Sequence, residues 1–229
     1  MKLTPRSIVS ASVAATLLSF ANLAPAANVT WGPVTQITSP ASLNQTGTFV
    51  SALNLGGGQG VLPVAGTDIT FNDAALTAPV GAGTVSNSYN AAYYDPTTGD
   101  TNLDAVLDSH SYLGGANPAG RARIDLTGLT PGTPYLVQVI GVSDIRTCCA
   151  DRLQTVDDGF GNTSDPLQRG LANSVTGSFI ADADTQSLFV SGVNDPGLSG
   201  LVLRAVPEPT SLTALALTAG TMLLRRRRA

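Results

Sequence analysis

The chain has little of what many catalytic sites require. Between residues 27 and 205 it contains no lysine and no glutamate, and its one histidine is His110. The absence of lysine excludes Schiff-base chemistry, and a lone imidazole excludes a metal site that needs two or three histidines. Lysine and glutamate are also strong helix formers on protein surfaces, so their absence disfavours long helices. We therefore predict a mostly β structure in which any carboxylate chemistry uses aspartate.

Basic residues are also scarce in this central part. Six arginines stand against fifteen aspartates, which gives residues 27 to 205 a net charge of −9, and the other six basic residues lie at the two ends. Proteins bind nucleic acids and anionic lipids through clustered lysine and arginine. The composition therefore argues against nucleic acid as a partner.

Residues 1 to 26 have the pattern of a secretory signal peptide. Lys2 and Arg6 precede an apolar stretch from Ile8 to Phe20, and Ala24-Pro25-Ala26 offers the small residues that signal peptidase recognises. We expect a signal helix that is cleaved before Ala27. The part up to residue 205 has the size of one domain.

Residues 206 to 229 form three blocks. The first is Pro207-Glu208-Pro209, whose prolines prevent a helix or strand from running through it. The second, Thr210 to Leu224, carries no charge and would span about 23 Å as a helix, which is short for a bilayer core of about 30 Å. The third block consists of Arg225, Arg226, Arg227 and Arg228. Arginines after an apolar run favour the cytoplasmic side of a membrane, so we expect a C-terminal transmembrane helix that is anchored there.

In sequence and spacing these blocks resemble the PEP-CTERM sorting signal of exported bacterial proteins. The resemblance covers about a tenth of the chain. It implies that a membrane-embedded exosortase recognises the Pro-Glu-Pro site and removes the tail. It also implies a protein that is released from, or attached to, the surface of a Gram-negative cell that makes exopolysaccharide. The alternative is an ordinary short membrane anchor that follows two prolines.

Short segments of the central part alternate apolar and polar residues and are separated by glycine, proline, asparagine and aspartate. This pattern is typical of a β-sandwich or barrel. Tyr135 to Val142 is apolar on both faces, which predicts a central strand, whereas Arg121 to Leu126 alternates strictly. The expected strands lie near 29–31, 48–55, 68–72, 121–126, 135–143, 152–156, 174–180, 186–191 and 200–205.

One segment has the periodicity of a helix. In Asn102 to Leu113, the residues Leu103, Val106, Leu107 and His110 fall on one helical face. We expect a short helix over this range, lying across one mouth of the sandwich.

Three pieces of sequence resemble the second half of galactose-binding-like jelly-roll domains, to which many carbohydrate-binding modules and malectin belong. They are the turn and strand entry Asp125 to Tyr135, the hairpin Phe179 to Asp184, and the last strand Gly200 to Arg204. The resemblance implies an all-β, jelly-roll-like β-sandwich. The first piece is also common in fibronectin type III-like domains. None of the three pieces is a ligand site, so the resemblance implies no binding residues.

Two groups of side chains could bind a sugar. Tyr93, Tyr94 and Tyr112 lie near the expected helix, and aromatic faces stack on the apolar faces of sugar rings. Charged side chains of both signs follow the central strand; they are Asp144, Arg146 and Arg152. The alternatives are that the tyrosines belong to the core and that the charged loop is solvated and holds internal ion pairs.

Two further features have an ordinary explanation beside the functional one. Cys148 and Cys149 are adjacent, so they could form a vicinal disulfide, remain free thiols or form an intermolecular bridge. Side chains with carboxylate or amide oxygens follow one another closely in the sequence at Asp95, Asp100, Asn102 and Asp104. They could hold a structural calcium ion, although the EF-hand pattern is absent. Turn formation explains these residues equally well. We predict no cofactor and no catalytic metal.

We expect a non-enzymatic protein, exported to the cell surface or beyond, that binds or associates with exopolysaccharide. Its partners during processing are signal peptidase and the exosortase, and the C-terminal helix holds it in the inner membrane until then. One alternative is a secreted polysaccharide hydrolase or lyase that uses aspartate carboxylates. The other is a purely structural or adhesive surface module.

Overall fold

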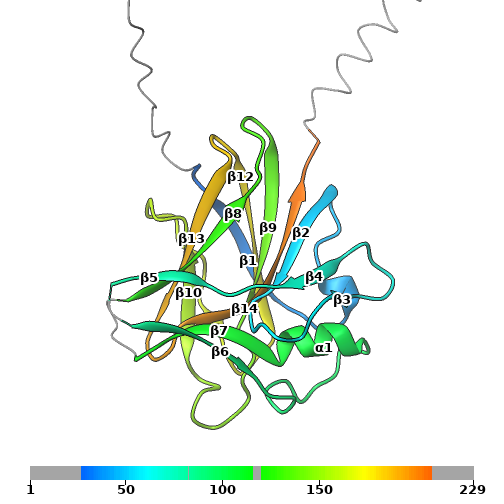
Figure 1. The fold of residues 1–229 in the computed structure, drawn as a ribbon, viewed down its shortest axis with the longest axis vertical. Helices are drawn as coiled ribbons and strands as arrows, with labels where there is room; N and C mark the ends of the chain where they lie inside the picture. Colours follow the sequence, from blue (N-terminus) through cyan, green and yellow to red (C-terminus); the bar gives the residue numbers. More distant parts are fainter. Residues whose placement is uncertain (1–26, 82, 116–119, 208–229) are drawn as a thin grey trace, which may run out of the picture.

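The computed structural model describes residues 27 to 207, except 82 and 116–119, and these residues form two β-sheets and one short α-helix (Figure 1). The first sheet, sheet A, consists of β1 (Thr30–Gln36), β2 (Thr48–Asn54), β3 (Leu62–Pro63), β4 (Thr70–Asp73), β6 (Thr84–Tyr89), β7 (Ser109–Gly114), β9 (Pro134–Gly141), β12 (Asn173–Ile180) and β14 (Gly197–Ala205). Sheet B consists of β5 (Thr77–Val80), β8 (Arg121–Thr127), β10 (Leu153–Asp157), β11 (Leu167–Gln168) and β13 (Thr185–Gly192). The helix is α1 (Thr101–Leu107), and a single 3-10 turn, η1 (Pro40–Ser42), follows β1.

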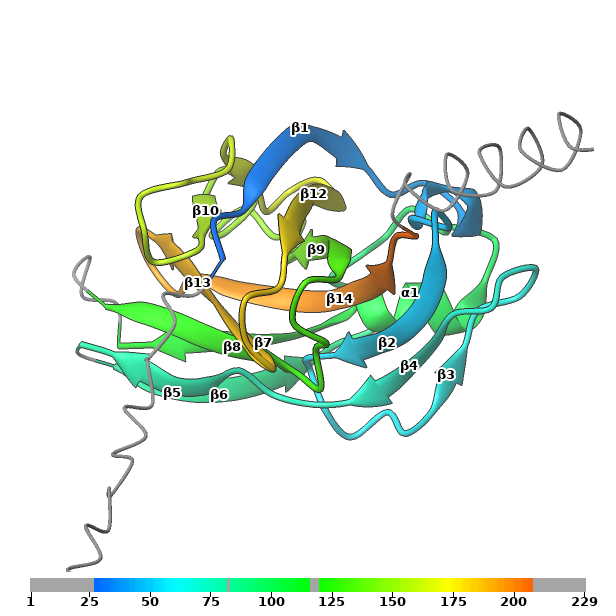
Figure 2. The same cartoon turned by 90° about the horizontal axis from the view of Figure 1, so that it is seen from above.

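The main path of sheet A runs β1-β12-β9-β14-β2-β4-β3, and sheet B runs β11-β10-β13-β8-β5. Sheet A bends between β1 and β3, as Figure 2 shows. The larger core cluster draws on both sheets, and its fully buried side chains include Val139 of β9 and Leu188 of β13. A second core cluster joins α1 to sheet A through Leu103, Leu107 and Val202. This arrangement confirms a two-sheet sandwich with one short helix.

The predicted central strand is confirmed. β9 pairs with β12 on one side and β14 on the other, antiparallel in both cases. Val137 and Val139 belong to the core between the sheets, whereas Ile140 belongs to the cluster beneath α1. Both faces of β9 are covered, which explains why apolar side chains point to both faces of the strand.

The prediction for residues 121–126 is also confirmed. In β8 the side chains of Ala122, Ile124 and Leu126 are buried, and the arginines and the aspartate between them are partly exposed. The turn that follows the strand closes with Thr133 N–H donating to the Thr130 carbonyl at 3.1 Å. Gly132 has φ +84° there, a value that suits glycine.

The expected helix over 102–113 is wrong in its second half. The helix ends at Leu107, and β7 begins at Ser109. Leu103, Val106 and Leu107 are buried as predicted, but His110 lies on a strand. β7 is extended because it pairs with β6 along its length and with the start of β14, and these partners are distant in sequence. The prediction also missed β3, β5, β6 and β11.

The described chain begins and ends at the same end of the sandwich. The N–H of Val206 donates to the Pro134 carbonyl at 2.8 Å, at the start of β9, and Figure 1 shows β14 ending beside this end of β9. The predicted signal peptide and the tail from Glu208 onward lie outside the described residues, so export and sorting stay predictions.

None of the helices in the described part of the chain has the length and hydropathy of a membrane span.

Candidate functional site

A pocket of about 220 Å³ lies at the far end of the sandwich from Val206. We call it the tyrosine pocket. Its walls come from β6 and the segment after it, from β7, and from the loops after β9, before β10, after β11 and before β14. The lining residues are Ser88, Tyr93, His110, Tyr112, Asp144, Arg146, Cys149, Arg152, Arg169 and Asp195.

Sheet pairing explains why these residues meet. β9 runs away from Pro134, which lies beside Val206, and its last residue Gly141 pairs with Leu198 near the start of β14. The segment after β9, which contains Asp144, therefore lies close to the segment before β14, which contains Asp195. Because β14 also pairs with β7 at Gly197, the side chains of β7 reach the same end.

Three aromatic rings form one side of the pocket. The ring of His110 lies between those of Tyr93 and Tyr112, with centroid separations of 5.2 and 5.4 Å. The hydroxyls of Tyr93 and Ser88 share a hydrogen bond of 2.7 Å. His110 is only 3% exposed, and its burial, helped by the charge of Arg169, lowers the pKa of the imidazole to about 3. The histidine is therefore neutral at ordinary pH.

An ion pair with two hydrogen bonds lies beside these rings. Arg146 Nε donates to Asp144 Oδ1 at 2.8 Å, and Arg146 Nη2 donates to Asp144 Oδ2 at 2.7 Å. The Arg146 guanidinium also lies over the Tyr93 ring, 4.5 Å from its centroid. Burial alone would raise the pKa of the Asp144 carboxyl, but the hydrogen bonds from Arg146 outweigh it and hold that pKa below its ordinary value.

A tight turn connects two of the three arginines that line the pocket, Arg146 and Arg152. Cys149 N–H donates to the Arg146 carbonyl at 2.8 Å, and Arg152 N–H donates to the Cys149 carbonyl at 3.1 Å. Cys148 and Cys149 are joined as a vicinal disulfide within this turn. The Arg152 side chain then donates to Asp195 at 3.0 Å. The disulfide therefore sits in the segment that positions Arg146 and Arg152.

The structure brings together five of the six ligand-binding candidates from the sequence. These five are Tyr93, Tyr112, Asp144, Arg146 and Arg152. The exception is Tyr94, which is buried in the core beneath α1 and whose hydroxyl donates to the Ile37 carbonyl at 3.4 Å. Sequence reasoning missed Arg169 and Asp195 because no motif surrounds either residue.

Two of the residues considered for calcium, Asp100 and Asp104, have local structural roles. Asp100 caps α1 by accepting from the N–H groups of Asn102 and Leu103, and it also accepts from Ala65 N–H. Asp104 accepts from the N–H and the hydroxyl of Thr98. Within the described ranges no group of three or more histidine, cysteine, aspartate or glutamate side chains is placed to hold a metal ion.

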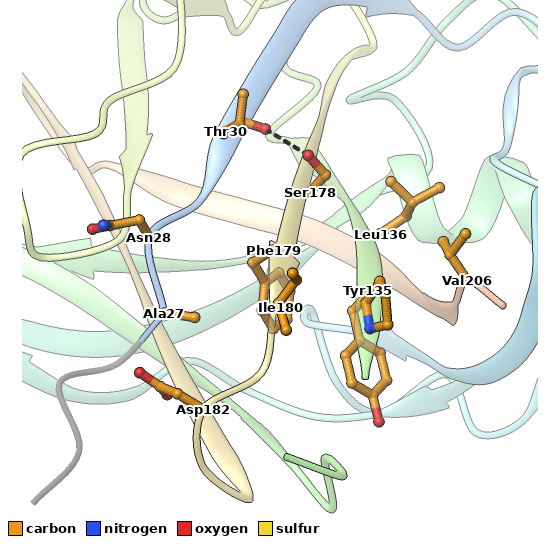
Figure 3. Close-up of a pocket in the computed structure, with 11 residues that line it drawn as sticks. Ala27, Asn28, Thr30, Tyr135, Leu136, Ser178, Phe179, Ile180, Asp182 and Val206 are labelled. Atoms are coloured by element: carbon orange, nitrogen blue, oxygen red, sulfur yellow. Dashed lines mark hydrogen bonds between the residues drawn. The ribbon is translucent and has the colours of Figure 1, made fainter. Parts of the chain in front are cut away.

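A larger pocket of about 600 Å³ lies at the opposite end of the sandwich, and its lining is shown in Figure 3. Its walls include Ala27, Phe179, Ile180 and Val206. Ala27 and Val206 stand at the limits of the described chain, so we assign no ligand to this pocket.

No protein-family model and no curated protein matches the sequence. Two solved structures from Arabidopsis thaliana are similar in fold. The ANXUR1 extracellular domain matches with a TM-score of 0.50 and 12% identity over 69% of this chain and 48% of that one. The ANX1 ectodomain matches with a TM-score of 0.50 and 12% identity over 75% and 56%. The chain thus spans about half the length of these ectodomains. At this identity the similarity concerns the fold alone, a β-sandwich of two sheets.

Proposed function

We propose that the protein is an exported, non-enzymatic module that binds a carbohydrate in the tyrosine pocket. The observation that carries this proposal is the convergence of the five candidate side chains. They come from three separate parts of the sequence, and they line one pocket. Tyrosine rings offer apolar faces to a sugar ring, while charged side chains offer hydrogen bonds to its hydroxyls.

The location of the pocket suits a protein that is sorted by its tail. Val206, with which the predicted sorting signal begins, lies at one end of the sandwich, and the tyrosine pocket lies at the other. A module attached through its C-terminal side would therefore present the pocket away from the cell. The similarity to two extracellular ectodomains supports an extracellular body. Exopolysaccharide is the ligand class that the resemblance to PEP-CTERM proteins favours.

The state of the carboxylates favours binding over hydrolysis. A glycosidase needs one carboxyl group with a raised pKa that can donate a proton. The pKa of Asp144 is instead lowered, and both of its oxygens accept from Arg146. Asp195 is paired with Arg152. Asp144 is therefore not suited to general-acid catalysis, which makes the hydrolase alternative less favoured.

Truncating an aromatic wall of the pocket should weaken sugar binding. Tyr112→Ala is expected to lower the affinity for a bound glycan about tenfold, since an aromatic contact contributes about 0.5 to 1.5 kcal/mol beyond its buried area. A glycan array with the full-length chain identifies the ligand, and calorimetry measures the loss. The matched control is Tyr89→Ala, because Tyr89 is 48% exposed and does not line the pocket. An array without any signal would leave the structural or adhesive role.

The sorting signal has a separate test. Glu208→Ala is expected to leave the uncleaved precursor in the membrane, because it removes the charged residue of the Pro-Glu-Pro site. Immunoblotting of membrane and extracellular fractions measures this outcome. Asp182→Ala, which removes an acidic residue of the body, should be processed normally. Normal processing of both variants would count against exosortase sorting and leave an ordinary membrane anchor.

A further inference from the structure

Arg169 is a buried cation that lines the tyrosine pocket. It follows β11 directly and is 3% exposed. Its backbone is well fixed, since its N–H donates to the Arg152 carbonyl at 3.0 Å and its carbonyl accepts from Asp144 N–H at 2.7 Å. Its guanidinium makes no ion pair and no hydrogen bond with any other described residue, and its Nε is among the buried atoms that have no partner.

The carboxylates of the pocket are already paired with other arginines. Asp144 accepts both of its bonds from Arg146, and Asp195 pairs with Arg152. Three arginines therefore face two aspartates, which leaves one excess positive charge in a body whose net charge is −9. The neighbouring His110 adds no charge, because its pKa is about 3.

A buried guanidinium without a hydrogen-bonded counter-charge is costly, because it has lost its hydration, and Asp144 and Asp195 act on Arg169 only through space. Burial and the nearby charge of Arg152 lower the pKa of Arg169 to about 10, so the side chain still carries its charge at neutral pH. The Nδ1 of His110 also has no partner. Two polar groups of the same pocket, Arg169 Nε and His110 Nδ1, thus have no hydrogen-bond partner among the described residues.

We infer that the ligand of the tyrosine pocket is an acidic sugar, whose carboxylate pairs with Arg169 while its ring lies against Tyr93 and Tyr112. This inference rests on the proposed carbohydrate-binding function and names the ligand class. A uronate carries a single negative charge, which matches the single excess positive charge of the pocket. Its planar carboxylate matches the fork of donors that a guanidinium presents.

Matched pairs of sugars test the inference on the full-length chain. We would titrate the methyl glycosides of glucuronate, galacturonate and mannuronate against those of glucose, galactose and mannose by calorimetry. The chain has apolar ends, so it should be kept in a mild detergent whose head group is not a sugar. We expect at least one uronide to bind about ten- to a hundredfold more tightly than its neutral partner, as a hydrogen-bonded charge contributes.

Substitutions test the role of the Arg169 charge. Arg169→Gln is expected to lower uronide affinity about ten- to a hundredfold, with a smaller effect on the neutral partner. The apo protein should fold at least as stably, because a buried unpaired charge is removed. Arg123→Gln removes the same charge from β8, outside the pocket lining, and should leave the preference for the acidic sugar intact.

A further variant, Asp195→Asn, makes the charge of the pocket more positive without truncating a buried residue. Asp195 is partly exposed and has φ 58°, a conformation that asparagine tolerates. Asp195→Asn should therefore fold even where Arg169→Gln does not. It is expected to tighten uronide binding about fivefold, since it removes a negative charge near the carboxylate.

The outcomes separate this inference from the proposed function. Equal affinity for the two members of every pair would overturn the acidic ligand but keep carbohydrate binding. Acetate that binds as tightly as the uronides would overturn it too, because the pocket would then be an anion site without sugar recognition. If no glycoside in the set bound, the acidic-sugar inference would fail, and a glycan array that was also silent would remove the proposed function.

Discussion

Replacing Arg204 by alanine is expected to lower the free energy of unfolding by about 3 to 4 kcal/mol. Arg204 lies on β14 and is 2% exposed. Its guanidinium donates to the Asn44 carbonyl at 2.6 Å, to the Gly47 carbonyl at 3.0 Å and to both oxygens of Asp68. Removing one partner of a buried, hydrogen-bonded ion pair costs about 3 to 5 kcal/mol, and the Asp68 side chain, which is 58% exposed, regains hydration and lowers that cost. Urea denaturation monitored by circular dichroism measures the loss.

Arg123→Ala is the matched control for this prediction. Arg123 also forms a two-point ion pair, with Nε and Nη2 donating to Asp125 at 2.8 and 2.6 Å. Its side chain is 42% exposed, however, and exposed ion pairs contribute about 0 to 1 kcal/mol. If the free energy of unfolding fell by the same small amount in both variants, Arg204 would not be the residue that holds the segment from Asn44 to Gly47 against β14.

The sandwich was predictable because its strands carry their burial pattern in their own sequence. Strict alternation in Arg121 to Leu126 reflects a strand with one covered face. The segment from Tyr135 to Val142, which is apolar except for Gln138, reflects a strand with two covered faces. The extent of the helix was not predictable in the same way. Residues after Leu107 keep an apolar spacing that suits a helix, but pairing with β6 and β14 decides their conformation, and no local signal announces partners so distant in sequence.

The candidate site was predictable only in part, for a related reason. Tyr93, Tyr112, Asp144, Arg146 and Arg152 were selected by their chemistry, and the antiparallel path of the sheet then brings them to one end. Chemistry alone did not separate Tyr93 from its neighbour Tyr94, which faces the core beneath α1. The same holds for Arg169, since a buried unpaired charge becomes visible only when the surrounding carboxylates are known to be engaged.

Acid is expected to destabilise the protein through His110. The folded pKa of this imidazole is about 3, whereas an unfolded histidine titrates near 6.5. Between these values the unfolded state binds one proton that the folded state does not, so the free energy of unfolding falls as the pH falls. The slope is about 1.4 kcal/mol per pH unit, and the contribution reaches about 3 kcal/mol between pH 8 and pH 4.

His110→Gln isolates this contribution, because glutamine keeps a polar side chain but does not titrate. Aspartates such as Asp125, whose pKa is lowered mainly by the hydrogen bond from Arg123, also lose stabilising interactions in acid, but they do so in both proteins. The stability difference between wild type and variant should therefore shift by about 3 kcal/mol in favour of the variant from pH 8 to pH 4. Urea titrations at several pH values give this difference directly. A difference that stayed constant with pH would mean that the imidazole takes up its proton in the folded state, and that the ring between Tyr93 and Tyr112 is open to water.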